Sequence, residues 1–184
     1  PRAVKDTLNS VLKDGKIDLT DIGLAEEDIR RTSQIYIVAC GSAYHVGMVA
    51  QYVIEDLVKI PVRVELASEF RYRKPILDPN GLVIIISQSG ETADSLAALR
   101  ETKAQGIRTL GIVNVVGSSI AREADKVFYT LAGPEISVAT TKAYSTQLMA
   151  SYILAIQFAK VKNTITEEQY ENYICLLYTS PSPR

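Results

Sequence analysis

The sequence has no tryptophan, only two cysteines and a single histidine, His45. Disulfide-stapled domains carry several cysteines, whereas Cys40 and Cys175 stand alone, so we expect two reduced thiols. Zinc sites and Ser-His-Asp triads draw on histidine, and neither motif surrounds His45. We therefore expect no metal, no cofactor and no catalytic triad.

The sequence also lacks an excess of one charge and any long apolar run. Lys and Arg number 20 against 21 Asp and Glu, so there is no net field to attract nucleic acid or an anionic membrane surface. Every apolar run is much shorter than the roughly 20 residues that a membrane-spanning helix needs. The first ten residues carry charges where a signal peptide would be apolar. These features predict a cytoplasmic protein that binds neither nucleic acid nor membranes.

Short apolar runs alternate with helical patterns along the centre of the chain. We expect strands at Ile35–Ala39, Val62–Leu66, Leu82–Ser87, Arg108–Val115 and Lys126–Leu131. Strands that are apolar throughout are typical of a parallel sheet covered on both faces by helices. The pattern predicts an α/β fold, namely a three-layer sandwich with a doubly wound, five-stranded parallel sheet of the flavodoxin type.

The flanking segments suggest the limits of the domain. Residues 1–34 predict an amphipathic helix, which Gly15 ends, and a polar connector. Residues 35–160 form the predicted ligand-binding domain, and residues 161–177 part of a C-terminal helix. Residues 178–184 turn abruptly to serine and proline, which cannot continue a helix, so we interpret them as a linker or a non-native tail.

Small hydroxyl residues gather where predicted strands end. Gly41-Ser42-Ala43 follows the first strand, Ser87–Thr92 the third, and a longer segment, Gly133–Lys142, the fifth. Ligands of open α/β sheets bind at these carboxyl ends, near the point where the strand order reverses. A helix N-terminus adds unpaired N–H groups and partial positive charge, and Gly90 allows close approach of the backbone. We predict a phosphate monoester site to which Ser87, Ser89 and Thr92 donate hydroxyl hydrogen bonds.

Other interpretations of these residues remain open. The nucleotide-binding motifs Gly-Lys-Ser/Thr and Gly-x-Gly-x-x-Gly are absent, and Ser-Gly-x-Thr could simply cap a helix. A contact to a sugar hydroxyl from His45, a nucleophilic Cys40 and a basic Glu91 each compete with a structural role. We favour the structural role in each case. His45 would be a hydrogen-bonded residue at a helix start, Cys40 a small buried hydrophobic side chain, and Glu91 a charge at a helix start. Lys142 either reaches the ligand or faces solvent.

Three segments, CGSAYH, SQSGETADS and EISVATTKAY, resemble the sugar isomerase, or SIS, family. The resemblance runs from about Ala3 to Lys160. The third segment has the form found in the aminotransferase branch of that family, which makes glucosamine 6-phosphate from fructose 6-phosphate and glutamine. In that branch the isomerase half contains two SIS subdomains, and this chain resembles the first.

The resemblance implies a set of ligand contacts. The phosphate contacts are Ser87, Gln88, Ser89 and Thr92, and the sugar contacts are Ser42, Ala43, Val138 and Ala139. Many members have Thr then Ser in place of Ser42 and Ala43, so one hydroxyl contact is lost here or replaced by a backbone group. The branch's glutaminase domain and second SIS subdomain, which carries its catalytic groups, are not found in this sequence. The resemblance therefore implies a fragment that binds phosphosugar without turnover, and it assigns no catalytic residue here.

Two rival functions belong to other classes. One is a free-standing SIS isomerase that uses Glu91 or His45 as its base, and the other is a sensor module that responds to a phosphosugar. SIS domains usually associate, which implies a homodimer. The apolar helix expected at Thr140–Lys160 is the surface that we expect to pair.

Overall fold

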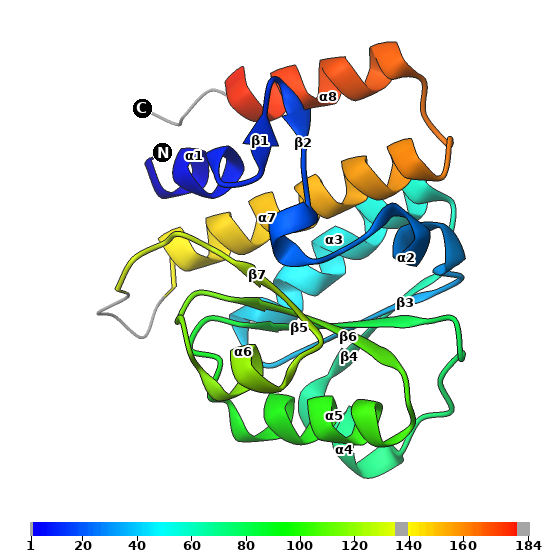
Figure 1. The fold of residues 1–184 in the computed structure, drawn as a ribbon. Helices are drawn as coiled ribbons and strands as arrows, with labels where there is room; N and C mark the ends of the chain where they lie inside the picture. Colours follow the sequence, from blue (N-terminus) through cyan, green and yellow to red (C-terminus); the bar gives the residue numbers. More distant parts are fainter. Residues whose placement is uncertain (1, 135–139, 180–184) are drawn as a thin grey trace.

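A computed structural model describes residues 2–134 and 140–179 (Figure 1). Its main sheet has five parallel strands in the order β4-β3-β5-β6-β7. They are β3 (Ile35–Ala39), β4 (Val62–Leu66), β5 (Leu82–Ser87), β6 (Arg108–Val113) and β7 (Lys126–Tyr129). This is the flavodoxin-type order, in which the direction of winding reverses between β3 and β5. The predicted fold class is confirmed.

The two central strands are apolar because helices cover them on both sides. Every residue of β3 and β5 is buried. In the register of this pair, Ile35 lies beside Leu82 and Ala39 beside Ile86, so the strands end level with each other. The turns that follow β3 and β5 therefore begin side by side.

Helices cover each face of the sheet, as Figure 1 shows. One face carries α3 (Ser42–Val58) and α7 (Lys142–Val161), and the other carries α4 (Ala67–Arg73), α5 (Ala93–Ala104) and α6 (Ser119–Glu123). The alternation of strand side chains supplies both cores. Ile37 packs in the core with α3 and α7, whereas its neighbour Val38 packs in the core with α4 and α5.

A further layer lies outside α7. It consists of α1 (Arg2–Asn9) and α8 (Glu167–Thr179), which both contact α7 (Figure 1). Most of α7 is thereby buried within the chain, which leaves only part of this helix exposed for the expected pairing. α8 ends at Thr179, two residues beyond the helix expected there, and the division into domains stays a prediction. In the described part of the chain, no helix has both the length and the apolarity to cross a bilayer.

The N-terminal segment differs from the sequence prediction. Helix α1 ends at Asn9, and a small antiparallel hairpin follows, formed by β1 (Leu12–Lys13) and β2 (Lys16–Ile17). Gly15 therefore does not end a helix. Asp14 and Gly15 have φ values of 50° and 73°, and two positive values are typical of the type I′ turn that joins short hairpins. The connector continues through η1 (Thr20–Ile22) and α2 (Glu26–Arg31).

Candidate functional site

A pocket of about 300 Å³ opens at the carboxyl ends of β3 and β5, where the winding reverses. Its lining consists of Cys40, Gly41, Ser42, Ala43, Ile86, Ser87, Gln88, Ser89, Thr92, Thr140 and Gln147. The structure thus brings together the predicted residues from the turns after β3 and β5. The two other predicted sugar contacts, Val138 and Ala139, lie outside the described residues.

The turn from Ser87 to Thr92 is shaped by its own hydroxyl groups. Ser87 is only 4% exposed, and its Oγ accepts the Gly90 N–H at 3.0 Å and lies 3.3 Å from Thr92 Oγ1. Ser89 Oγ accepts the Glu91 N–H at 3.2 Å. The amides of Gly90 and Glu91 are therefore used within the turn. Each serine hydroxyl still has its own proton, which it can donate to a ligand oxygen.

The start of α5 offers the unused donors. Thr92 precedes the helix in an extended conformation, and its side chain makes no capping hydrogen bond. Thr92 therefore occupies the N-cap position, as its place in the sequence predicted, but its side-chain hydroxyl is not used to cap the helix. The first helical hydrogen bond runs from Leu96 N–H to Thr92 O, so the amides of residues 93–95 have no partner within the helix. These donors and the positive end of the helix dipole lie next to the hydroxyls of the turn.

Gly90 is required by the packing behind the turn. Its φ is +67°, and a Cβ built at this position would lie 2.1 Å from Ser118 Oγ. No residue with a side chain fits this position without a rearrangement of the Ser118 loop. Ser118 Oγ is itself buried without a hydrogen-bond partner in the described part of the chain.

The loop between β6 and α6 holds the turn from behind. Asn114 N–H donates to Gln88 O at 3.2 Å and Ile120 N–H donates to Gly90 O at 3.0 Å. Ser119 N–H donates to Glu91 Oε1 at 2.7 Å, and this hydrogen bond lowers the pKa of Glu91. A general base works best with a pKa near the working pH, so the structure does not favour Glu91 as a base. Glu91 is a helix-start charge as predicted. It precedes α5 in the sequence, but its carboxylate binds the first amide of α6.

The opposite side of the pocket is formed by α3 and the approach to α7. Ser42 is the first residue of α3, and its Oγ lies 3.2 Å from Thr140 Oγ1. Ala43 is buried beside it. Thr140 and Gln147 were not among the predicted site residues. The sequence does contain a sign that Gln147 is a candidate site residue, because it is a polar side chain on the otherwise apolar stripe of the helix.

The structure also places the residues whose roles were left open. The His45 ring is exposed and lies edge-on to Tyr44, with no hydrogen bond among the described residues, so the favoured structural role is not seen. Cys40 is half-buried and lines the pocket, and the Ser95 hydroxyl lies 3.8 Å from its Sγ. The Lys142 amino group donates to the carbonyl of Pro134. Nowhere in residues 2–134 and 140–179 do three or more His, Cys, Asp or Glu side chains gather as a metal site would require.

The fold and the pocket define a doubly wound α/β domain with a small, hydroxyl-lined pocket at its switch point. Residues 28–157 match the family model described as "SIS domain". The chain belongs to the SIS domain family.

Two curated relatives and one solved structure resemble most of the chain. The glutamine–fructose-6-phosphate aminotransferase (isomerizing) of Clostridium tetani is 57% identical over 172 residues, which are 93% of this chain and 28% of that protein. The same enzyme from Clostridium acetobutylicum is 55% identical over 182 residues, or 98% of this chain and 30% of that protein. The C-terminal domain of glucosamine-fructose-6-phosphate aminotransferase from Francisella tularensis superposes with a TM-score of 0.92 at 46% identity. That match covers 97% of this chain and 50% of the solved chain.

Proposed function

We propose that this domain binds a sugar 6-phosphate, with fructose 6-phosphate as the ligand of choice. The observation that carries the proposal is a pocket lined by Ser87, Ser89 and Thr92, the last of which lies directly before α5. In this proposal the phosphate is held by Ser87, Gln88, Ser89 and Thr92. The sugar is held by Ser42, Ala43, Val138 and Ala139.

The chemistry of the pocket supports a small phosphate ester. No lysine or arginine of the described residues lines it, so the anion would be held by hydroxyls, amides and the helix dipole. Neutral donors bind phosphate without desolvating a cation, which suits a ligand that must be released. The volume of about 300 Å³ lies at the small end of ligand pockets.

We further propose that the domain belongs to the isomerase half of a cytoplasmic glutamine–fructose-6-phosphate aminotransferase, also called glucosamine-6-phosphate synthase. The chain spans 28–30% of the length of its Clostridium relatives, and the activity for which those enzymes are named supports this proposal. A glutaminase domain and a second SIS subdomain would be its partners in the parent chain, and a second copy would form a homodimer. Isomerisation needs a positioned base. The described pocket lining has no carboxylate or histidine, so the domain alone should bind without turnover.

Calorimetric titration with fructose 6-phosphate tests the site. Ser89→Ala and Thr92→Ala should each weaken binding about tenfold, because each removes one hydroxyl donor to a charged ligand. Ser33→Ala is the matched control. It removes a hydroxyl just before β3, at the amino ends of the strands, whereas the pocket lies at their carboxyl ends. Unchanged affinity in both site variants would refute the proposed site. Interconversion of ketose and aldose phosphates by the wild-type chain would favour a free-standing isomerase instead.

A further inference from the structure

Gln147 is a buried polar residue whose side chain is unused by the fold. It is 2% exposed, lies one turn after Ala143 in α7 and lines the pocket. Within the described residues its side-chain amide makes no hydrogen bond, although its backbone carbonyl accepts the Ser151 hydroxyl. Buried polar side chains nearly always have a hydrogen-bond partner. An unused amide at this position therefore suggests a partner that enters the pocket.

The amide is not sealed in the core. Ser118 Oγ is the one side-chain nitrogen or oxygen atom, among the described residues, that is fully buried without a hydrogen-bond partner. The amide of Gln147 is therefore not fully enclosed, although the residue is only 2% exposed, and Gln147 lines the pocket.

The two ends of the pocket lie on opposite faces of the sheet. Helix α5, whose start offers donors for the phosphate, covers one face, whereas α7 covers the other (Figure 1). A ligand with its phosphate at the start of α5 would extend toward the side where Ser42, Thr140 and Gln147 lie. Ser42 and Thr140 are within hydrogen-bonding distance of each other there, at 3.2 Å. Gln147 therefore belongs to the sugar end of the pocket.

We propose that the Gln147 amide binds hydroxyl groups of the sugar and makes the pocket prefer a phosphosugar over a bare phosphate. This inference rests on the proposed function. A carboxamide offers two donor hydrogens and an acceptor oxygen, and a sugar hydroxyl both donates and accepts, so one side chain can pair with neighbouring hydroxyls. The amide is neutral, so it distinguishes ligands by their hydroxyls and adds no charge beside the phosphate.

Titrations of the 184-residue chain with fructose 6-phosphate and with inorganic phosphate separate the two ends of the site. Gln147→Met keeps a similar length and removes all hydrogen bonding. It should weaken fructose 6-phosphate binding about tenfold and leave inorganic phosphate binding unchanged. Gln147→Leu should act in the same way and serves as the second variant if the first folds poorly. Thermal unfolding of each variant verifies the fold.

Gln157→Met is the matched control on the same helix. The Gln157 amide oxygen accepts the Tyr170 hydroxyl at 3.3 Å, so this variant should lose some stability and keep its affinity for fructose 6-phosphate. If the wild-type chain binds the sugar phosphate and both Gln147 variants bind it equally well, this inference fails and the proposed function stands. Equal weakening of both ligands would also overturn it. A wild-type chain that does not bind fructose 6-phosphate would overturn both.

Discussion

At the scale of single residues, the turn after β5 depends on the contact between Gly90 and Ser118. Gly90→Ala should be strongly destabilising for two separate reasons. Alanine at a left-handed φ of +67° costs roughly 1–2 kcal/mol. Its Cβ would also overlap Ser118 Oγ at 2.1 Å, which adds further destabilisation. Urea unfolding measures the sum, and titration with fructose 6-phosphate should show weaker binding.

Gly117→Ala separates these two costs. Gly117 has a φ of +73°, and a Cβ added there would have no atom within 4 Å, so this variant carries the backbone strain without the overlap. It should be less destabilising than Gly90→Ala. The double variant Gly90→Ala with Ser118→Gly should approach the stability of Gly117→Ala. Equal stability of the two single variants would show that the contact with Ser118 does not constrain the turn.

The carboxylate of Glu91 should make stability depend on pH. Its pKa is lowered from the usual 4.5 by the hydrogen bond from Ser119, and Arg122 nearby acts in the same direction. A lowered folded-state pKa means that the stabilisation is present above pH 4.5 and is lost as the pH falls through the folded value. The melting temperature of Glu91→Gln should therefore lie below that of the wild type at about pH 7. The difference should vanish in acid.

Glu171→Gln provides the control for this experiment, because it removes the same charge from an exposed position beyond the first turn of α8. Its melting temperature relative to the wild type should not show this dependence on pH. If the difference in melting temperature between Glu91→Gln and the wild type stays constant from about pH 7 down to about pH 3, the Glu91 carboxylate does not stabilise the fold through its charge.

The sequence located the turn after β5 better than it located the part of the pocket lining that α7 contributes. Ser87, Ser89 and Thr92 lie in one short motif directly after a buried strand, so local pattern was sufficient. Gln147 is far from that motif in sequence and reaches the pocket only because α7 packs across the sheet beside α3. Tertiary packing of this kind leaves a weak local signal, here one polar residue on an apolar stripe.

At the scale of elements, the five strands could be predicted because burial on both faces demands continuous apolar runs. The hairpin of β1 and β2 was missed because each strand has two residues and carries no periodicity. Its one local signal was the Asp14–Gly15 pair, which is typical of a two-residue hairpin turn. A partner of the hairpin lies in α8, where the Tyr170 hydroxyl accepts the Ile17 N–H, and sequence order does not reveal it.

Tyr170 of α8 joins these distant elements. Its hydroxyl accepts the Ile17 N–H at 2.8 Å and lies 3.3 Å from Gln157 of α7, and the residue is 1% exposed. Tyr170→Phe leaves the buried Ile17 N–H without its acceptor and should cost about 1–3 kcal/mol of stability. Urea unfolding measures this loss. Binding of fructose 6-phosphate should be unchanged, and weaker binding would show that the outer helices and the pocket are coupled.

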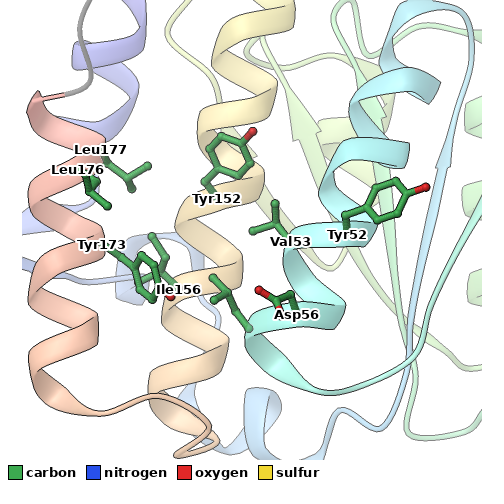
Figure 2. A pocket seen from close by; sticks show the side chains of 9 residues that line it. Tyr52, Val53, Asp56, Tyr152, Ile156, Tyr173, Leu176 and Leu177 are labelled. Carbon is green, nitrogen blue, oxygen red and sulfur yellow. The ribbon is translucent and has the colours of Figure 1, made fainter.

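At the scale of the whole molecule, a second and larger apolar groove lies away from the pocket. It has a volume of about 580 Å³ and runs between α3, α7 and α8, as Figure 2 shows. Its lining comprises Tyr52, Val53, Asp56, Leu57, Tyr152, Ile156, Tyr173, Leu176 and Leu177. Tyr52 is 74% exposed at its edge. Exposed apolar surface of this kind is typical of interaction sites.

The proposed homodimer would cover this groove with a second copy of the chain. In a two-fold symmetric dimer each substitution acts twice, so one charge in the groove should have a large effect. Tyr52→Glu places a carboxylate near Asp56 and should weaken association about tenfold or more. Tyr72→Glu is the control, since Tyr72 is 76% exposed on α4, which covers the opposite face of the sheet. Light scattering over a concentration series should give a dimer for the wild type and for Tyr72→Glu, and a monomer for Tyr52→Glu. A monomeric wild type would contradict the homodimer and leave the groove to another domain of the parent chain.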